Sequence, residues 1–518
     1  MRSILYVAMA TLCCSAYAQA DSVQLKFAAT ITQDDLRRHL TILASDEYEG
    51  RETGMKGQKM AAQYIREQFI AYGIPPVPEA ASKGLLNGYE QPFPLELARP
   101  GGLSLVVDGS PIGFMQEFFY LSERLTADFT SPSIQYVGYG RKEALQNDYA
   151  GIDVRGGAVL ILEDGMGEDG EPPADFFQRL TRKTKAAEEA GAAVLLVATP
   201  YTKALMTRYA HYITTPRMKL VDAKTPSAPR SGVQTVIIDK TTAEQILAKG
   251  KLNWKKATRK HAKARRSIPC SFLARNTPTR ERLQGENVLG YIEGTDKKDE
   301  LVVITAHYDH IGKDGEEVFN GADDDGSGTV AVLEMAEAFA RAKAAGQGPR
   351  RSVLFMPVSG EEKGLLGSEW YSDHPVFPLE QTVADLNIDM IGRTDSAHAS
   401  SVPYVYIIGS DRLSTELHEL NERANSTYTK LLLDNTFNSE DDPNRFYYRS
   451  DHYNFAKHGI PVIFYFNGVH EDYHQAGDET EKIRFDLLEQ RTKLVFHTAW
   501  AIAEREQRPL VDKPLKKE

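Results

Sequence analysis

Cysteine and tryptophan are scarce in this chain of 518 residues, which contains three of each. Cys13 and Cys14 lie in an apolar N-terminal stretch that we expect to be removed, so that Cys270 alone remains. A single cysteine cannot form an intrachain disulfide, and thiolates cannot supply the ligand set of a zinc site. The folded chain must therefore obtain its stability from a large hydrophobic core, as a large exported protein without disulfides does.

Positive charge and long apolar runs are also lacking. Lysine and arginine total 61 against 72 aspartates and glutamates, and the net charge of −11 argues against nucleic acid as the main partner. Beyond the N-terminus no apolar run reaches the roughly 20 residues of a membrane helix, so we expect no stable membrane insertion. With 42% apolar and 26% charged residues, the composition is that of a globular protein of about two to four domains. The oligomeric state does not follow from it.

The first twenty residues, MRSILYVAMATLCCSAYAQA, combine Arg2 with an apolar stretch and small residues at Ala16 and Ala18. This pattern is typical of a secretory signal peptide and predicts cleavage after Ala18 or Ala20. A short membrane anchor is the alternative, but the apolar stretch is shorter than the roughly 18–20 residues that a spanning helix requires. We therefore expect a secreted or periplasmic protein.

Residues 21–105 are predicted to form the N-terminal part of a larger domain. Apolar residues recur at helical spacing within 33–74, and the polar, glycine-bearing segment DEYEGRETG predicts a loop between two helices. Residues 106–280 contain short β-rich pieces, which indicate a separate small α/β or β-sandwich-like module. A basic run at 251–266 marks its end and is expected to be a solvated linker or an exposed helix. Contact of this run with a polyanion or an outer-membrane lipid is the alternative.

Residues 281–510 alternate between strand-like and helix-like segments. Strands are expected at 301–306, 352–358, 382–388, 403–409 and 460–466, and helices at 328–346 and 485–505. Such alternation predicts an α/β fold with a mostly parallel central sheet flanked by helices.

Histidines and carboxylates cluster at the ends of these expected strands or in glycine-rich turns. They are His307 in ITAHYDHIG, Asp324 in NGADDDGSG, Glu361 and Glu362 in VSGEEKGLLGS, Asp389 in NIDMIG and His474 in DYHQAGDE. An α/β sheet presents the side chains at its strand ends to a shared crevice. These residues can hold two divalent ions and leave one glutamate uncoordinated, which is the set of groups that a metal-dependent hydrolase requires.

Each motif can supply a particular part of such a site. His307 follows a strand, and Asp309 could accept a hydrogen bond from its other ring nitrogen. Three consecutive aspartates precede a helix, although capping of the helix requires only one aspartate. The middle aspartate, Asp324, is therefore the candidate to bridge two ions. Asp389 ends an apolar strand, where an unpaired carboxylate is costly. Tyr473 could stabilise an oxyanion.

The adjacent Glu361 and Glu362 can perform two tasks because neighbouring side chains point in different directions. One binds metal, and the other takes a proton from a metal-bound water and passes it to a leaving amine. His310, His452 and His470 are rival ligands that we expect to be structural or to support the ligands. The nitrogen and oxygen donors suit zinc, with cobalt or manganese as substitutes, and disfavour calcium.

In order along the chain, the motifs His-x-Asp, Gly-Ala-x-Asp, Ser-Gly-Glu-Glu, Asp-Met and Tyr-His resemble those of the co-catalytic dizinc aminopeptidase family that includes bacterial leucyl aminopeptidase. Residues 43–65 resemble the N-terminal part of the peptidase domain in members that carry an insert. Residues 135–162 resemble a protease-associated domain, which is the usual insert. The resemblance implies a zinc-peptidase fold over 21–105 and 281–510, interrupted by a β-rich protease-associated domain and basic linker at 106–280.

The resemblance also implies the roles of individual residues. It gives two zinc ions per chain, with His307, Glu362 and Asp324 on the first and Asp324, Asp389 and His474 on the second. It implies Glu361 as general base and Asp309 as the carboxylate that orients a ligand, and Tyr473 remains the candidate oxyanion donor. The expected function is a secreted zinc aminopeptidase that uses a bridging metal-bound water to hydrolyse peptides with a free N-terminus.

Three other functions stay open. A carboxypeptidase on the same scaffold would need a cationic pocket, for which Arg393, Arg445 and Arg449 are placed in suitable regions. A glutaminyl cyclase would need only one metal ion. A non-catalytic peptide-binding protein would use the metals structurally, but an uncoordinated Glu361 speaks against it.

Overall fold

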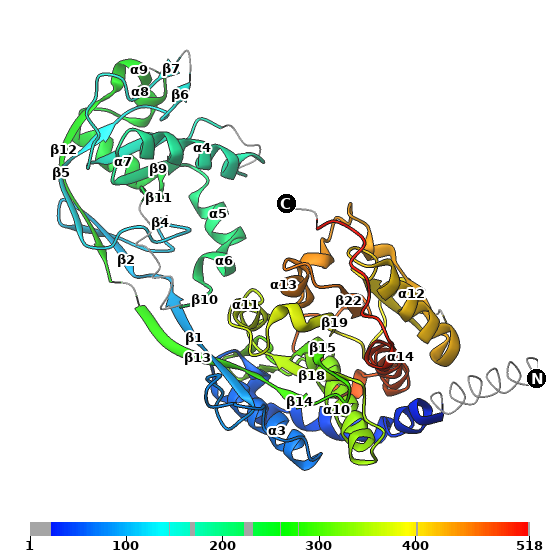
Figure 1. The fold of residues 1–518 in the computed structure, drawn as a ribbon. Helices are drawn as coiled ribbons and strands as arrows, with labels where there is room; N and C mark the ends of the chain where they lie inside the picture. Colours follow the sequence, from blue (N-terminus) through cyan, green and yellow to red (C-terminus); the bar gives the residue numbers. More distant parts are fainter. Residues whose placement is uncertain are drawn as a thin grey trace, which may run out of the picture. The chain divides into compact units, whose positions relative to one another are not determined.

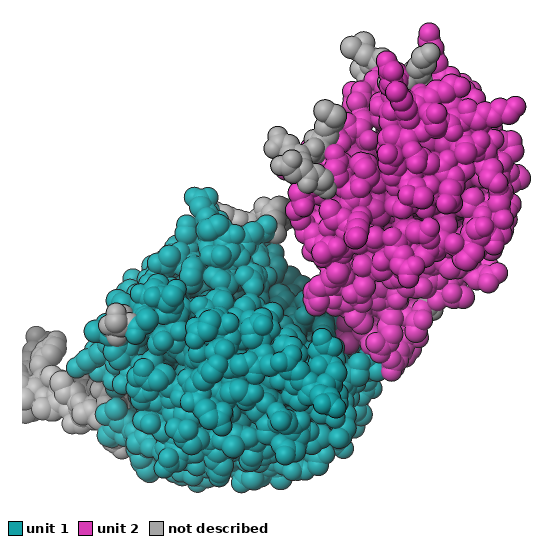
Figure 2. Space-filling model, turned by 180° about the vertical axis from the view of Figure 1, so that it is seen from behind, with its two compact units in different colours: residues 1–95, 283–518 teal, residues 96–282 magenta. Residues whose placement is uncertain are grey.

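The computed structural model describes residues 22–143, 146–165, 171–221, 232–259, 261–277, 279–399 and 402–515. The chain divides into two compact units, unit 1 of residues 1–95 with 283–518 and unit 2 of residues 96–282 (Figure 2). The chain enters unit 2 within β1 (Glu90–Arg99) and leaves it within β13 (Thr279–Val288). The predicted signal peptide lies outside the described residues. Within them, no helix has both the length and the apolar character needed to cross a membrane.

Unit 1 is built around a seven-stranded sheet (Figure 1). In spatial order its strands are β14 (Gly290–Ile292), β18 (Arg351–Val358), β15 (Lys297–His307), β19 (Thr382–Ile388), β22 (Val462–Phe466), β20 (Tyr404–Ile408) and β21 (Leu432–Asp434). The four central strands β18, β15, β19 and β22 are mutually parallel, and only the β14–β18 and β20–β22 pairs are antiparallel. The prediction of a mostly parallel sheet is therefore confirmed.

Helices cover both faces of this sheet. One face packs against α2 (Gln33–Leu43), α3 (Lys56–Ala71), α10 (Gly328–Ala344), α12 (Thr415–Ala424) and α14 (Phe485–Glu504), and the other against α11 (Leu366–Asp373) and α13 (His452–Ala456). Alternate residues of β15 enter the two cores: Val302 and Ile304 belong to the first, and Leu301 and Val303 to the second. Burial on both faces explains why the central strands are continuous apolar runs.

The segment between α2 and α3, predicted as a loop, contains the 3-10 helix η1 (Asp46–Arg51). Glu49, Gly50 and Arg51 all have positive φ, so this helix ends in a tight left-handed turn. A Cβ on Gly50 would lie 2.3 Å from the carbonyl oxygen of Gly312, and only glycine permits that approach. The turn brings the N-terminal segment against the chain that follows β15.

Unit 2 contains an eight-stranded mixed sheet. Its order is β3 (Ser110–Ile112), β2 (Leu103–Val107), β12 (Arg266–Asn276), β5 (Phe129–Tyr136), β8 (Ala158–Leu162), β9 (Val194–Thr199), β11 (Gln234–Asp239) and β4 (Phe118–Phe119). The strands β5, β8, β9 and β11 run parallel; α4 (Phe176–Glu189) lies in the connection between β8 and β9, and α7 (Lys240–Lys249) follows β11. A further three-stranded sheet has the order β10 (Arg217–Leu220), β1, β13.

The basic run at 251–266 forms two short helices, α8 (Trp254–Arg259) and α9 (His261–Ala264), that lead into β12. Lys255, Lys256 and Arg259 are exposed, whereas Arg265 and Arg266 donate hydrogen bonds to main-chain carbonyl groups. Cys270, on β12, is buried and has a free thiol.

Candidate metal centre

Four parallel strands of unit 1 end at one edge of the sheet and present the predicted residues there. His307 is the last residue of β15, Asp389 directly follows β19, and Glu361 and Glu362 follow β18 after a turn. His474 lies in the loop after β22. Since β18, β15, β19 and β22 are neighbours, their carboxyl ends form one crevice, as expected for a parallel sheet.

Asp324 connects the two sides of this crevice. It lies in the turn η2 (Ala322–Ser327) immediately before α10. Its Oδ1 is 3.2 Å from Nε2 of His307, and its Oδ2 is 3.2 Å from Nε2 of His474. A carboxylate whose two oxygens face two different imidazoles has the geometry of a bridging ligand.

The remaining ligand candidates divide between the two histidines. Nε2 of His307 lies 3.6 Å from Oδ1 of Asp389, and Nε2 of His474 lies 3.3 Å from Oε2 of Glu362. The grouping that pairs His307 with Glu362 and His474 with Asp389 is therefore wrong. Asp389 lies beside His307 because β19 is the neighbour of β15, whereas Glu362 follows the turn at Gly360 and reaches the His474 side.

These separations fit zinc. Ligand atoms about 2.0–2.1 Å from a tetrahedral zinc ion lie about 3.3 Å from one another. Oδ2 of Asp324 and Oε1 of Glu362 are buried, and the groups facing them are imidazole nitrogens, as in a set of ligand atoms around a cation. Nδ1 of His310 lies 2.8 Å from Oε1 of Glu362, so this rival histidine contacts a ligand candidate. The donor set is nitrogen and oxygen throughout, which suits zinc.

Glu361 and Glu362 differ in their electrostatic surroundings. Burial raises the pKa of Glu362, but hydrogen bonds from His310 and His474 outweigh burial and lower that pKa to about 2. Burial also raises the pKa of Glu361, and the negative charge of Glu362 raises it further. The pKa of Glu361 therefore lies well above the usual range of a glutamate. Two carboxylates whose pKa values are driven apart are suited to different tasks.

Asp309 contacts His307 through its main-chain oxygen, whereas a contact through its carboxylate was expected from the sequence. Nδ1 of His307 lies 3.0 Å from the main-chain oxygen of Asp309 and 3.9 Å from its carboxylate Oδ1. The carboxylate accepts hydrogen bonds from Oγ1 of Thr53 at 2.6 Å and from the main-chain N–H of Glu361 at 3.3 Å. Asp309 thus connects His307 to the Glu361 turn.

The aspartates around Asp324 hold the turn itself. Asp325 accepts hydrogen bonds from the main-chain N–H groups of His307 and Met390. Asp323 accepts from Gly392 N and contacts Nε2 of His470 at 3.1 Å. The peptide bond between Asp324 and Asp325 is cis.

Sequence reasoning missed Arg51, which is 1% exposed and lies within unit 1. Its guanidinium donates to the carbonyl oxygens of Tyr308 at 2.8 Å, Asn320 at 2.6 Å, Gly321 at 2.9 Å and Leu43 at 2.8 Å. Tyr308 lies between His307 and Asp309, and Gly321 precedes the three aspartates. Arg51 therefore holds together the two segments that carry the first ligand candidates.

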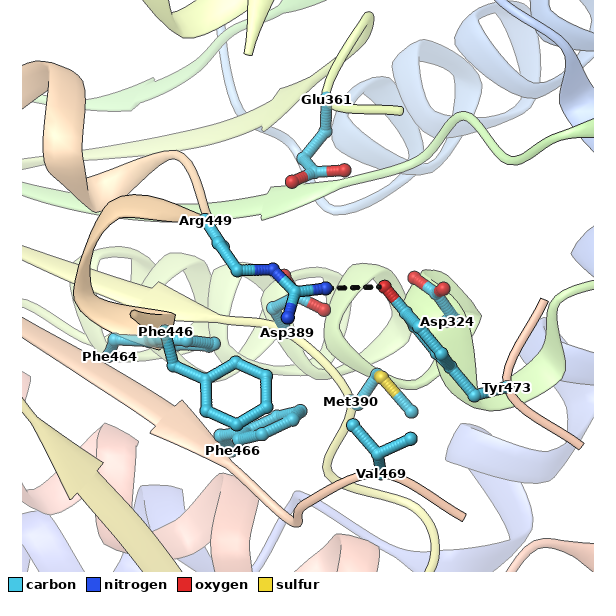
Figure 3. A pocket seen from close by; sticks show the side chains of 10 residues that line it. All are labelled: Asp324, Glu361, Asp389, Met390, Phe446, Arg449, Phe464, Phe466, Val469 and Tyr473. Atoms are coloured by element: carbon cyan, nitrogen blue, oxygen red, sulfur yellow. Dashed lines mark hydrogen bonds between the residues drawn. The ribbon is translucent and has the colours of Figure 1, made fainter. Parts of the chain in front are cut away.

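Aromatic and basic side chains complete the pocket (Figure 3). Its apolar wall consists of Met390, Phe446, Phe464, Phe466 and Val469. On the other side Arg449 donates from Nη2 to the hydroxyl oxygen of Tyr473 at 3.3 Å. Burial raises the pKa of Tyr473, which therefore keeps its proton.

The other residues with rival roles lie outside this pocket. Arg393 pairs with Asp472 at 3.1 Å, and the guanidinium of Arg445 lies 4.6 Å from the ring centre of Tyr448. His452 stacks on Phe464 at 4.8 Å, and burial lowers its pKa to about 3. His452 is therefore a neutral core residue.

Comparison with known proteins matches part of the chain. Residues 287–499 match the sequence profile of Peptidase family M28. A probable leucine aminopeptidase of Arthroderma otae is 30% identical over 214 residues, which is 40% of this chain and 55% of that protein. A probable glutamate carboxypeptidase of Arabidopsis thaliana is 31% identical over 145 residues, 28% of this chain and 20% of that protein.

Among solved structures, an aminopeptidase from Aneurinibacillus sp. strain AM-1 has the same fold. It is 20% identical, with a TM-score of 0.52, and the match covers 95% of this chain and 100% of that chain. The chain spans about half or less of the length of the two curated relatives above.

Proposed function

Because residues 287–499 match the sequence profile of peptidase family M28, we propose that the chain is a zinc-dependent aminopeptidase that removes residues from the free N-terminus of peptides. The observation that carries this proposal is the contrast in surroundings between the adjacent glutamates Glu361 and Glu362. Glu362 contacts two histidines and has a lowered pKa, whereas Glu361 lines the pocket and has a raised one. A ligand and an adjacent proton acceptor are the two carboxylates that a metal-dependent hydrolase needs.

Two zinc ions per chain follow from the two groups of ligand candidates. His307, Asp324 and Asp389 would hold one, and Asp324, Glu362 and His474 would hold the other. A bound zinc pair supplies polarisation of the scissile carbonyl and an acidified water as nucleophile. Thr53 and Asp309 would fix His307 and the Glu361 turn in place for this chemistry.

Glu361 and Tyr473 would carry the proton transfer and charge stabilisation. Glu361 lies 3.9 Å from His307 Nε2, at the edge of the ligand group, where its carboxylate can accept a proton from the water and return it to the leaving amine. The hydroxyl oxygen of Tyr473 accepts from Arg449, which leaves the Tyr473 proton free to donate to an oxyanion.

The apolar wall of the pocket supports a substrate site that holds the side chain of one residue at a time. Phe446, Phe464 and Phe466 are buried beside Asp389 and leave a small pocket next to the candidate zinc site. A pocket of this composition favours an apolar or aromatic side chain on the first residue of the substrate, because each buried methylene contributes about 0.8 kcal/mol.

A carboxypeptidase is the second candidate function, since Arg449 places a cation in the same pocket. The Arabidopsis relative carries the name of such an enzyme. We favour the aminopeptidase because Arg449 already donates to Tyr473 and three carboxylates line the pocket against this single cation. Leucine anilide, which has a free amine and no carboxylate, separates the two when compared with an N-acetylated dipeptide.

We also propose that the protein is exported and that unit 2 is a domain inserted into the peptidase domain. The residue pattern of 1–20 supports removal of a signal peptide, and the protein would then act in the periplasm or outside the cell. Unit 2 is proposed to be the protease-associated domain, which the likeness of 135–162 and its position as an insert between Leu95 and Leu283 support. N-terminal sequencing of the exported protein tests the first of these proposals.

The decisive experiment compares Glu361→Gln with Glu362→Gln. Glu361→Gln should retain two zinc ions per chain and lose about 10²–10⁴-fold in kcat on leucine anilide, the contribution of general acid–base catalysis. Glu362→Gln should lose zinc as well as activity. Zinc is measured by metal analysis after dialysis. Full activity of Glu361→Gln, or loss of zinc from it, would contradict the assignment.

A further inference from the structure

Unit 2 contains a cavity of about 790 Å³ that none of the proposed catalytic chemistry uses. All its lining residues lie between Glu96 and Arg280, so the cavity belongs to unit 2 alone. Five of them are basic and two acidic, namely Arg99, Arg124, Arg217, Lys219 and Arg280 against Glu96 and Glu123. Its volume is in the range of about 300–1,000 Å³ that is typical of ligand sites.

The two acidic residues of the cavity are already engaged. Glu96 is buried and pairs with Lys219 at 3.1 Å and Arg280 at 3.2 Å. Glu123 accepts a hydrogen bond from the hydroxyl of Tyr120 at 2.9 Å. Glu96 is thereby paired, whereas Glu123 keeps its charge, so the five basic residues of the wall exceed the two acidic ones by three.

Arg124 is the unbalanced charge. Its side chain is half-buried and makes no hydrogen bond or ion pair with any residue that the structure describes. The loop that carries it is fixed, because Gln234 accepts from the main-chain N–H of Arg124 at 2.7 Å and donates to the carbonyl oxygen of Ser122 at 3.0 Å. A guanidinium without a protein partner in a cavity wall is available to pair with an anionic group of a ligand.

A second unpaired atom lies in the same wall. Oδ1 of Asn276 is buried and lacks a donor among the described residues, while its Nδ2 donates to the carbonyl oxygen of Leu125. Such an acceptor requires an N–H or O–H group from a ligand. Much of the remaining lining is apolar and includes Leu121, Ile213 and Met218.

We propose that this cavity binds an acidic peptide segment in an extended conformation. A carboxylate of the peptide pairs with the Arg124 guanidinium, a main-chain N–H donates to Oδ1 of Asn276, and apolar side chains cover the Leu121 side. Inorganic phosphate would satisfy Arg124 but would leave the Asn276 acceptor and most of the volume unused. The site makes the protein a receptor for acidic peptides, independently of hydrolysis.

The test is isothermal titration of the full chain with acetyl-Glu-Leu-Glu-Leu-amide and with its Gln-Leu-Gln-Leu analogue. Both ends of these peptides are blocked, so binding does not depend on the proposed aminopeptidase activity, and the titration is repeated after zinc is removed with a chelator. The acidic peptide should bind at least about tenfold more tightly than the neutral one, with or without zinc.

Arg124→Met should weaken binding of the acidic peptide by about tenfold or more, and Arg124→Lys should restore part of the affinity. Arg155→Met is the matched control, because Arg155 is an exposed arginine of unit 2 that pairs with Asp153 outside the cavity. Circular dichroism verifies that each variant folds. Equal affinity of Arg124→Met and the unaltered protein would overturn the proposal, as would equal binding of the two peptides or displacement by phosphate at the concentration of the peptide.

Discussion

Arg51 provides a direct test of how the candidate metal centre is held together. Its guanidinium serves four main-chain carbonyl groups, and Tyr308, Asn320 and Gly321 belong to the segments that carry His307 and Asp324. A hydrogen bond from a charged donor contributes about 1.5–3 kcal/mol. A lysine at this position keeps the charge but reaches only one or two of the four carbonyls, so we expect Arg51→Lys to lower the free energy of unfolding of unit 1 by about 3–5 kcal/mol.

The same substitution should weaken zinc binding. Freed carbonyls allow the Tyr308 and Gly321 segments to shift, and misplacing the support of a metal ligand typically costs about 10–100-fold in affinity. Unfolding is followed in urea by tryptophan fluorescence, since Trp370 and Trp500 both lie in unit 1. Zinc affinity is measured by competition with a chromogenic chelator on the folded protein.

Arg351→Lys is the matched control. Arg351 is also fully buried and donates to the carbonyl oxygens of Ile502 at 2.9 Å and Arg505 at 2.5 Å, but it lies at the start of β18, at the opposite end of the strand from the ligand candidates. It should lose comparable stability and keep its zinc affinity. The reasoning is refuted if Arg51→Lys binds zinc like the unaltered protein, or if both variants lose zinc equally.

Two further substitutions probe the surroundings of the site. Ser450→Ala removes the hydroxyl that donates to Oδ2 of Asp389 at 2.7 Å and should reduce zinc affinity by about 10–100-fold in the chelator competition, whereas unchanged affinity would show that Asp389 does not depend on Ser450. His452 has a pKa of about 3 in the folded protein, so the unfolded chain binds an extra proton below about pH 6.5, and stability falls as the pH drops from there toward 3. His452→Phe should remove about 2 kcal/mol of the fall in the free energy of unfolding between pH 7 and pH 5, measured by urea unfolding of the zinc-free protein. If the free energy of unfolding of the variant depended on pH as in the unaltered protein, His452 would be excluded as the cause.

The sheet of unit 1 was predictable because its strands are apolar on both faces. The expected strand at 382–388 coincides with β19, and that at 352–358 lies within β18. The expected strand at 301–306 is shorter than β15, because the first residues of β15 are charged and give no apolar signal. Local pattern therefore identified the strands and their buried parts.

The identity of the ligand candidates was predictable, but their pairing was not. Residue type and position at a strand end bring His307, Asp389 and Glu362 to one edge of the sheet. Which carboxylate faces which histidine depends on the spatial order of the strands and on the turn at Gly360, whose φ is 84°. Neither property is encoded locally, so pairing required the structure.

Arg51 and Thr53 were not predictable as parts of the site. Both lie in a polar, glycine-bearing segment whose local pattern indicates only a loop. Their partners, Tyr308 and Asp309, are more than 250 positions away in the sequence, and no periodicity connects such distant segments.

The insertion of unit 2 between Leu95 and Leu283 makes unit 1 discontinuous, and this has a consequence for its assembly during synthesis. When residues 22–95 leave the ribosome, the carbonyls that Arg51 will bind at Tyr308, Asn320 and Gly321 have not yet been made. Unit 2 is complete earlier, and domains generally fold as units in the order of synthesis. The N-terminal segment must therefore wait, with its apolar helix faces uncovered, which makes it the part of the nascent chain most in need of a chaperone.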